Sequence, residues 1–590
     1  MGTISDKLMR IINTKEDIRR ALISKGYDVP TSIPFKEYAK MILDLPCKID
    51  DFPELPGDVT RWHFGGLTNE MMAAMDDPRI EDADHKGRFL SFKNFAWSGM
   101  SGVGGYVQDF NYFRNNTTVD KVRIDEQGSN SIKVTILNTE INNAIYIIKN
   151  IYQFNKSYFI KISSEGYDEG DMALSFYALS TSTATTVTVS LNPNGITEIP
   201  AIKEDDFLAV YLTVGGKVGS ITIEQLPLYP GALVFDGVDD YGVCDNFPIL
   251  TKEKGYTVVA LRQYITRNEG PLGLVSNIEN WFKDGAFLLE FREIAVSQFN
   301  RPISFGAVGK ERDLPCVLTY QTSKSYNGVS IEAGNFTGTD VLHVGKLSPK
   351  LAGYCNAAIW ELVFLDHDAT EEELTKIKDY FVKTYPWLFP DQAWTVTGKT
   401  NEDTDRATIA NITGNGNDLV LSNLGFAEGS GYNEEGEYAG YLVTDGVDDE
   451  VRSAAFTLNK DWTIVGNWEF ITNENKNAGL TKVYSFYLYN RDYGIFVYKY
   501  INAGQGFSVK DVKSLKAICS DGRIYLNDWQ EIRNNIEQEA TISKGVMAIG
   551  YFNRDFTKVA FKNLGIYNNQ LLSKDDCIKA YNYLQTLKSK

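Results

Sequence analysis

Two acidic segments contain the first residues whose types and spacing could do chemistry. The sequence Asp-Gly-Val-Asp-Asp occurs at 236–240 and again at 445–449. Clustered carboxylate oxygens are the hard ligands that Ca²⁺ prefers, but Asp and Gly also shape tight turns in which carboxylates bond to nearby backbone amides. We therefore expect no cofactor; if Ca²⁺ does bind, its ligands would be Asp236, Asp239, Asp240, Asp445, Asp448 and Asp449.

Aromatic side chains near predicted turns are the second source of candidate chemistry. An exposed aromatic ring can stack on a pyranose face while Asn and Asp side chains bond to the hydroxyls. The alternative is that each ring belongs to a hydrophobic core, which is the commoner position of an aromatic residue in a β-rich chain. The candidate carbohydrate-binding residues are Trp97, Tyr106, Trp281 and Trp529.

The remaining composition excludes several classes of site and partner. The 6 Cys and 4 His are scattered without metal-ligand spacing, which predicts buried free thiols and no zinc site. A net charge of −18 disfavours nucleic acid and anionic membranes as partners, because phosphate neutralisation needs clustered Lys and Arg. The sequence shows neither a secretory signal nor an apolar run that approaches a membrane span, so we expect synthesis in a cytoplasm.

The elements that must position these residues are predicted to be mainly strands. A chain of 590 residues is too long for one core, so about three or four domains are expected. The 33 Tyr and 32 Phe favour half-buried pleated surfaces, and the 49 Gly supply turns between short strands.

Residues 1–46 differ from the rest and show three amphipathic stretches typical of short helices. The second begins at Thr14, with Asp17 as its capping-box partner, and the third runs from Pro34 to Pro46. Helices of this length are marginal in water unless their apolar faces are covered. They could pack on each other or on the next domain, but we favour docking onto another protein or another copy of the chain.

An internal duplication defines the architecture. The pattern Trp-x-x-x-Gly-x-Thr-Asn-Glu starts at Trp62 and again at Trp394. Each acidic segment is followed by a short apolar strand, at 256–259 and at 462–465. A strand and a helix close each copy, and the predicted capping boxes of these helices are Thr370 with Glu373 and Ser573 with Asp576.

The spacing between matching blocks locates an insertion. Asn423 shortly precedes the second acidic segment, whereas Asn94 lies far ahead of the first. The extra residues show six alternating strands separated by turns, which predicts a sandwich of their own. The predicted domains are a helical docking segment at 1–50, a first sandwich unit at 58–100 with 231–390, an inserted sandwich at 101–230 and a second sandwich unit at 391–590.

The repeat resembles the concanavalin A-like lectin/glucanase (laminin-G-like) family. The resemblance rests on the Phe-Asp-Gly-Val-Asp-Asp-Tyr turn, the aromatic-Thr-Val/Ile-Val strand after it, and the closing strand with its Thr-x-x-Glu helix. It implies tandem jelly-roll β-sandwiches at 231–390 and 391–590, and the insertion resembles a carbohydrate-binding module. Glucanases on this fold use a Glu-x-Asp-x-x-Glu strand, but the nearest acidic run, 204–206, is followed by Ala209 where the second Glu would stand. We therefore expect no enzyme activity.

The opening of the chain is similar to the helical N-termini of phage tail and fibre proteins. Residues 94–106 resemble structural proteins of Bacteroidetes-infecting phages, including crAss-like phages. These resemblances imply a virion structural protein, made in the host cytoplasm, that forms a head or tail fibre. It would attach to other virion proteins through residues 1–46, form a homo-oligomer (dimer or trimer), and present lectin-like domains to host-surface glycans. Two alternatives stay open, a purely architectural virion component without a ligand and a polysaccharide depolymerase tailspike.

Overall fold

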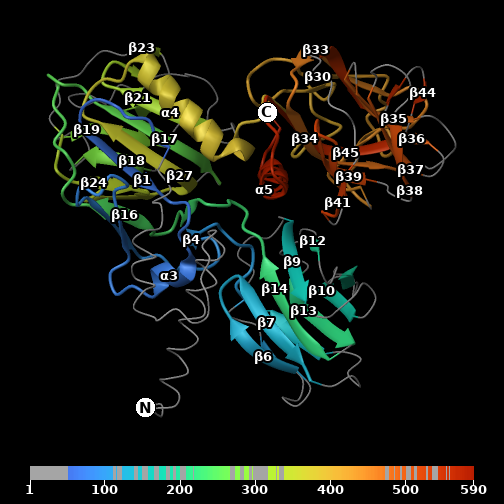
Figure 1. Ribbon diagram of the computed structural model, residues 1–590, viewed down its shortest axis with the longest axis horizontal. Coiled ribbons are helices and arrows are strands. Elements are labelled where there is room, and N and C mark those ends of the chain that lie inside the picture. Colours follow the sequence, from blue (N-terminus) through green and yellow to red (C-terminus); the bar gives the residue numbers. More distant parts are fainter. Residues whose placement is uncertain are drawn as a thin grey trace, which may run out of the picture. The chain divides into compact units, whose positions relative to one another are not determined.

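The computed structural model is mainly β, as the sequence predicts, and its sheets are mostly antiparallel (Figure 1). The predicted helical docking segment at 1–50 and Trp281 lie outside the residues that the structure describes. The described residues are 51–110, 114–115, 122–137, 144–148, 157–164, 172–180, 186–190, 195–199, 207–216, 218–265, 273–278, 285–290, 295–296, 317–326, 329–330, 338–436, 438–471, 478–483, 486–491, 494–499, 506–510, 514–526, 529–533, 543–549, 551–552, 555–556 and 558–589.

Few helices occur among the described residues, and none of them is long and apolar enough to cross a membrane. They are α3 (Asn69–Ala73), α4 (Glu371–Thr384), the 3-10 helix η4 (Pro386–Leu388) and α5 (Lys574–Gln585). Helix α5 begins as predicted, because the Ser573 hydroxyl accepts the backbone N–H of Asp576 at 3.1 Å. Two compact units are distinguished, one of residues 1–55 with 371–381 and one of residues 56–370 with 382–590.

The first sandwich is built from two sheets of the second unit. The first sheet runs β23 (Val329–Ser330), β22 (Ser325–Tyr326), β21 (Val317–Thr322), β17 (Thr257–Tyr264), β27 (Asn356–Leu365), β15 (Leu233–Asp236), β4 (Gly102–Val103), with β1 (Val59–His63) also on β27. The second runs β2 (Arg79–Glu81), β3 (Phe89–Lys93), β16 (Tyr241–Cys244), β24 (Leu342–Val344), β18 (Gly273–Ile278), β19 (Gly285–Glu290), β20 (Ala295–Val296). In the same sheet, β26 (Leu351–Tyr354) pairs with β18 and with β25 (Lys346–Ser348).

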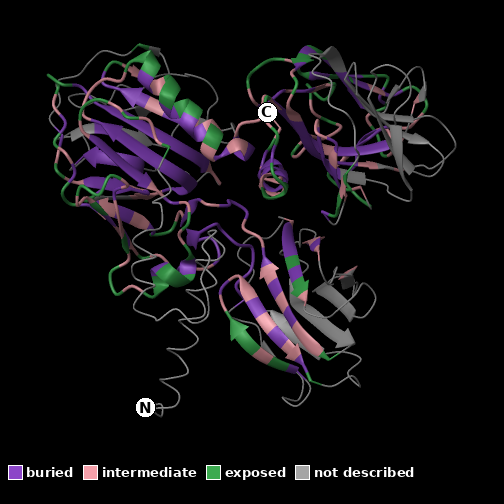
Figure 2. Cartoon of the chain, in the orientation of Figure 1, coloured by how far each residue is buried: buried purple, intermediate pink, exposed green. Residues whose placement is uncertain are grey.

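One hydrophobic core joins these two sheets. It includes Trp62 of β1 and Val258 of β17 from the first sheet, and Phe92 of β3 and Val344 of β24 from the second, each at most 3% exposed. Alternation places them inside, since in β3 Leu90 and Phe92 are buried while their neighbours along the strand are not. Figure 2 shows that the central strands of this sandwich, such as β17 and β27, are buried along nearly their whole length.

The second sandwich, formed by residues that follow η4, has the same construction. Its first sheet runs β31 (Gly431–Tyr432), β32 (Leu442–Val443), β45 (Val559–Asn568), β34 (Trp462–Phe470), β39 (Ser514–Cys519), β40 (Arg523–Leu526), β41 (Glu531–Arg533), with β28 (Gln392–Thr395) also on β45. Its second runs β29 (Thr408–Ile409), β30 (Leu419–Ser422), β33 (Glu450–Leu458), β42 (Ser543–Ile549), β35 (Ala478–Val483), β36 (Phe486–Arg491), β37 (Gly494–Lys499), β38 (Gly506–Lys510), and a separate pair is β43 (Tyr551–Phe552) with β44 (Asp555–Phe556).

The sequence repeat is therefore a repeat of the fold. In each copy the long strand β27 or β45 pairs with three equivalent partners, β1, β15 and β17 in the first and β28, β32 and β34 in the second. Trp62 lies opposite Leu362, and Trp394 lies opposite Leu564. Both tryptophans are fully buried, which explains why the repeat retains them. The predicted tandem sandwiches are confirmed.

The inserted residues form two further five-stranded sheets. One runs β11 (Thr186–Ser190), β10 (Met172–Ser180), β13 (Phe207–Gly216), β8 (Ala144–Ile148), β5 (Arg114–Asn115), and the other runs β12 (Ile196–Ile199), β9 (Tyr158–Ser164), β14 (Gly219–Gln225), β7 (Ser131–Ile136), β6 (Val122–Gln127). Gln225 fixes the end of this insertion to its beginning. Its Oε1 accepts the backbone N–H groups of Val107 and Gln108, both at 3.1 Å.

Candidate functional site

The first acidic turn is closed by its own carboxylates. Asp236 Oδ1 accepts the backbone N–H groups of Val238 at 2.7 Å and Asp239 at 3.4 Å. Asp240 Oδ2 accepts the backbone N–H of Asp236 at 3.0 Å, and Ser101 donates its hydroxyl to Asp240 Oδ1 at 2.9 Å. Asp240 is fully buried, so these bonds satisfy both oxygens of an inaccessible carboxyl group.

The second acidic turn repeats these bonds. Asp445 Oδ1 accepts the backbone N–H of Val447 at 2.7 Å, Asp449 Oδ2 accepts that of Asp445 at 2.7 Å, and Ser430 donates to Asp449 Oδ1 at 3.1 Å. In each turn, oxygens of the three Asp side chains lie within 4.8 Å of one another, so they could approach one cation. The backbone bonds by themselves account for the recurrence of these residues, which supports the structural interpretation of the turn.

Burial changes the protonation of these turns. Burial, with the neighbouring Asp236 carboxylate, raises the pKa of Asp240 to about 8. Burial likewise raises the pKa of Asp449. A carboxyl group that keeps its proton near neutral pH must lose it before it can bind a cation. Any cation at these turns would therefore bind more weakly as the pH falls.

Two of the predicted carbohydrate-binding residues are core residues. Trp97 is 7% exposed and its ring stacks on Phe95 with centroids 4.8 Å apart. Tyr106 is 8% exposed, and its hydroxyl accepts a hydrogen bond from Asn130 at 3.1 Å. Neither ring has an open face for a pyranose, so the prediction of exposed stacking platforms at these two positions is wrong. The physical reason is that Trp97 packs into the core of the first sandwich, whereas Tyr106 is buried where Asn130 of the insertion reaches its hydroxyl.

Each copy contains one asparagine, not predicted from the sequence, that binds the short strand β4 or its equivalent β31. Asn69 binds both backbone groups of Val103, because its Oδ1 accepts the N–H at 2.7 Å and its Nδ2 donates to the carbonyl at 3.2 Å. Asn401 makes the same two bonds to Tyr432, each at 2.8 Å. The signal was present in the repeated Thr-Asn-Glu triplet, which contains both asparagines.

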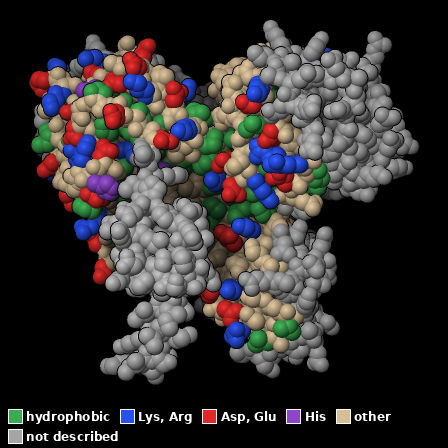
Figure 3. All heavy atoms as spheres, viewed as in Figure 1, with side chains coloured by type: hydrophobic (Ala, Val, Ile, Leu, Met, Phe, Trp, Pro, Cys, Tyr) green, Lys and Arg blue, Asp and Glu red, His purple; other side chains and the backbone are tan. Residues whose placement is uncertain are grey.

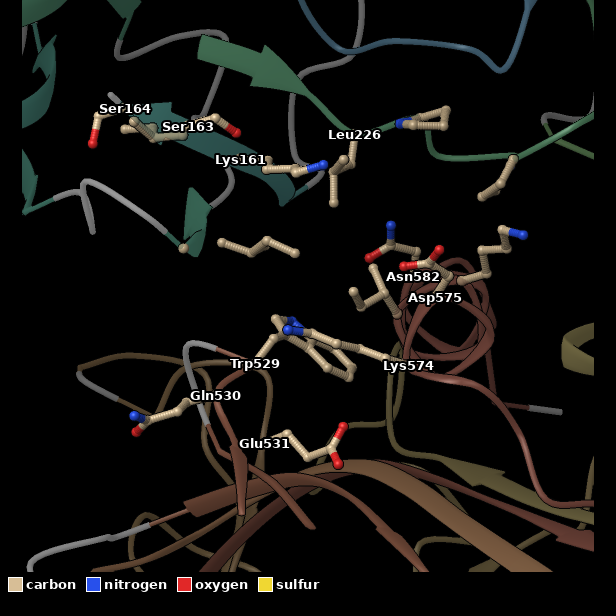
Figure 4. A pocket seen from close by; sticks show the side chains of 17 residues that line it. Lys161, Ser163, Ser164, Leu226, Trp529, Gln530, Glu531, Lys574, Asp575 and Asn582 are labelled. Carbon is tan, nitrogen blue, oxygen red and sulfur yellow. The ribbon is translucent and has the colours of Figure 1, made fainter. Parts of the chain in front are cut away.

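A cavity of about 850 Å³ is lined by β9, the segment after β14, the residues around Trp529 and helix α5 (Figure 4). In Figure 4, Lys161 and Leu226 lie on one side, Trp529 lies on the opposite side, and Asp575 and Asn582 project from α5. Its wall is partly apolar, with Ile162, Ile196, Leu226, Pro227, Pro230, Trp529 and Ile578, and partly polar, with Lys161, Ser163, Ser164, Gln530, Glu531, Lys574, Asp575, Lys579 and Asn582.

Two residues of this lining, Trp529 and Asn582, each have a side-chain polar atom that is buried and unsatisfied. Trp529 is 1% exposed and Asn582 is 5% exposed. Trp529 Nε1 and Asn582 Oδ1 have no hydrogen-bond partner among the described residues. The Trp529 ring is held edge-on against Tyr581 with centroids 5.7 Å apart and lies 6.2 Å from the Tyr525 ring. The structure thus places Trp529 in a cavity wall, where it is buried instead of forming an exposed platform.

The charged side chains around the cavity are largely neutralised. Three of them have partners of opposite charge: Lys161 with Glu224 at 3.9 Å, Lys579 with Asp576 at 3.5 Å, and Glu531 with Arg533 at 2.9 Å. Lys574 and Asp575 add one charge of each sign. The cavity is therefore polar without a strong net charge. Acidic and basic side chains are similarly interspersed over the first sandwich in Figure 3.

Tyr581 connects the insertion to the second sandwich beside Trp529. Its hydroxyl donates to Glu198 Oε2 at 3.2 Å and accepts from Lys516 Nζ at 2.6 Å. Lys516 Nζ also lies 3.7 Å from Glu198 Oε2, and the ring of Phe159 packs edge-on against Tyr581 with centroids 5.3 Å apart. Burial lowers the pKa of Lys516 and raises that of Tyr581. This network joins β12, which contributes Ile196 to the cavity wall, to α5, which contributes Asn582.

Comparison with known proteins gives only remote similarities. No family model matches the chain, and no curated protein matches it. Among solved structures, it is similar to a Trypanosoma rangeli sialidase in complex with sialic acid, with 10% identity and a TM-score of 0.23 over 89% of this chain and 98% of that chain. It is also similar to the botulinum neurotoxin serotype D binding domain, with 10% identity and a TM-score of 0.24 over 58% of this chain and 88% of that chain. Similarities this remote carry no functional argument.

Proposed function

We propose that the protein is a non-enzymatic structural component of a tailed-phage particle, a fibre or appendage that uses its β-sandwiches to bind host-surface glycans. The phage origin is supported by the sequence resemblances of the opening helices and of residues 94–106. A homo-oligomer, dimer or trimer, would present several weak sites at once, so that modest affinity at each site suffices for attachment. Residues 1–46 would dock it onto other virion proteins.

The observation that carries glycan binding is the cavity around Trp529. Ligand sites in proteins combine a mostly apolar wall with a few polar groups that fix orientation. The cavity has this mixture, since Ile196 and Leu226 lie in the same lining as Gln530 and Asn582. Its volume of about 850 Å³ is in the range of small-molecule sites.

Binding accounts for the cavity better than hydrolysis does. Glycosidases need two carboxyl groups that flank the scissile bond, with one of them free to give a proton. The lining contains two carboxylates, Glu531 and Asp575. Glu531 is already held by two donors, because its Oε1 accepts from Arg533 at 2.9 Å and its Oε2 accepts from the Tyr525 hydroxyl at 3.3 Å. Asp240 and Asp449 of the acidic turns accept backbone N–H groups. These bonds favour structural roles for Glu531 and for the turn carboxylates.

A glycan array probed with the full chain tests this function. We expect selective, concentration-dependent binding to a small set of bacterial surface glycans and no release of reducing ends from them. Silence across the array would favour a purely architectural component, an alternative supported by the core positions of Trp97 and Tyr106. Release of reducing ends would instead establish a depolymerase.

A further inference from the structure

We propose that Cys519 and Cys577, two buried thiols that meet between strand β39 and the first turn of helix α5, form a disulfide when the protein encounters a peroxide oxidant. The bond would fasten α5 to the first sheet of the second sandwich. This inference goes beyond the proposed glycan binding and does not depend on it, because it concerns a modification site inside one sandwich.

The two sulfur atoms share one set of contacts. Cys519 Sγ lies 3.8 Å from Thr463 Oγ1, and the same Thr463 oxygen accepts the backbone N–H of Leu572 at 3.0 Å. Cys577 Sγ lies 4.0 Å from the carbonyl oxygen of Leu572. The Cys577 thiol also donates a hydrogen bond to the Cys519 sulfur. Both residues are at most 2% exposed, so the thiols contact each other and not bulk solvent.

The first sandwich lacks this pair at the equivalent positions. In the second copy the threonine of β34 is paired with Cys519, whereas the equivalent threonine of β17 in the first copy is paired with Thr322. Counted from the predicted capping residue of each closing helix, the equivalent of Cys577 is Leu374. The same fold therefore forms without a thiol at either position, which favours a chemical role for the pair.

The surroundings give the two thiols different reactivity. The hydrogen bond from Cys577 lowers the pKa of Cys519, and the nearby Arg523 guanidinium acts in the same direction. Burial raises the pKa of Cys577, so this residue keeps its proton as the donor. Cys519 is therefore the thiolate that attacks the oxidant, and Cys577 is the thiol that resolves the product.

The reaction balances with hydrogen peroxide as the oxidant. The Cys519 thiolate attacks one peroxide oxygen, so that an S–O bond forms, the O–O bond breaks, and the departing hydroxide takes up a proton to become water. The Cys577 sulfur then attacks the Cys519 sulfur, so that the S–S bond forms, the S–O bond breaks, and the Cys577 proton leaves with the hydroxyl group as a second water. Each sulfur loses one electron, and the peroxide gains two.

Access to the buried pair requires only a small oxidant and a local movement. Cys577 lies in the first turn of α5, and helix ends open locally at a lower cost in free energy than the whole fold does. Because both thiols are buried, we expect slow oxidation that is limited by this opening.

Peroxide treatment of the reduced full chain tests the proposal. We expect the intact mass to fall by two hydrogen atoms, two of the six cysteines to become unreactive towards a thiol reagent after unfolding, and one tryptic cross-link to join the peptides of Cys519 and Cys577. The Tm should rise by at least about 5 °C, because the bond closes a loop of about 60 residues in the unfolded chain. Six reactive thiols after treatment, a cross-link between other cysteines, or an unchanged Tm would overturn the proposal.

Single variants assign the reaction to this pair. In Cys577→Ala the sulfenic acid of Cys519 has no resolving partner, so we expect dimedone to label Cys519 and no cross-link to form. In Cys519→Ala the attacking thiol is absent, so we expect neither a cross-link nor dimedone at Cys577. The matched control is Cys355→Ala, because Cys355 is also fully buried, and this variant should cross-link as the wild type does.

The two variants of the pair keep the proposal falsifiable. If one of them fails to fold by thermal melting, the other decides. A loss of two hydrogen atoms in the variant that folds would show that other cysteines react, and the assignment to Cys519 and Cys577 would then be wrong.

Discussion

Substitution of Glu198 tests the network that joins the insertion to the second sandwich. The change Glu198→Gln leaves the Lys516 ammonium, whose side chain is 11% exposed, without the carboxylate that lies 3.7 Å away. Removing one partner of a buried ion pair typically costs about 3–5 kcal/mol. Because the Glu198 side chain is 27% exposed, we expect the lower end, about 3 kcal/mol.

Scanning calorimetry provides the assay. A loss of about 3 kcal/mol lowers the Tm of a domain of about 150–250 residues, such as the second sandwich, by about 6–12 °C. The matched control is Glu224→Gln on the same insertion, since Glu224 faces Lys161 at 3.9 Å in an exposed pair that is worth less than about 1 kcal/mol. Adding Lys516→Met to Glu198→Gln should restore most of the lost stability, because an apolar side chain can replace a buried ion.

The pH dependence has a defined sign. Burial lowers the pKa of Lys516 below its usual 10.5, so between these two values the unfolded chain binds more protons than the folded one and stability rises with pH. Tyr581, whose pKa is raised by burial above its usual 10.0, opposes this only above pH 10. Lys516→Met should flatten the rise. Equal effects of Glu198→Gln and Glu224→Gln, or no recovery in the double variant, would refute this reasoning.

Three further predictions concern the repeated loop and turn. Asn69→Ala should lower the free energy of unfolding by about 2–4 kcal/mol, because two buried backbone groups of Val103 lose their partner. Urea denaturation measures this loss. A loss smaller than that caused by Asn401→Ala would contradict the expectation from the greater burial of Asn69. Asp240 should contribute a fall in stability as pH rises from about 4 to about 8, since folded Asp240, with its pKa raised to about 8, keeps a proton that the unfolded chain releases. Asp240→Asn should therefore make the pH slope of stability less negative over this range, and an unchanged slope would contradict the assignment to Asp240. Chelation with EGTA should leave the Tm unchanged, because backbone bonds close the turns; a calcium-dependent rise in Tm would restore the metal interpretation.

The fold could be predicted from the sequence because its signals are local and repeated. The blocks at Trp62 and Trp394 correspond to equivalent strands with equivalent partners, and the capping residue Ser573 does begin α5. The alternation of apolar and polar side chains also predicted that the insertion is built from strands. The predicted docking helices at 1–50 lie outside the described residues, so that expectation stays a prediction.

The site was much less predictable. Burial of Trp97 depends on a loop that folds inward, with Trp97 itself at φ +52°, a backbone conformation that composition and alternation do not reveal. The cavity is assembled from residues as far apart in the chain as Lys161 and Asn582, so no spacing in the sequence indicates it. The sequence indicates Trp529 only as an aromatic residue near a turn, whereas its place in a cavity wall depends on residues distant in the chain.

One measurement tests most directly whether the protein is a structural component of a phage particle. Immunogold electron microscopy of mature particles from the infected host, with an antibody against the full chain, is that measurement. We predict gold at regular positions on projecting fibres or appendages. Particles without gold, from a lysate in which the same antibody detects abundant free protein, would contradict a structural role in the virion.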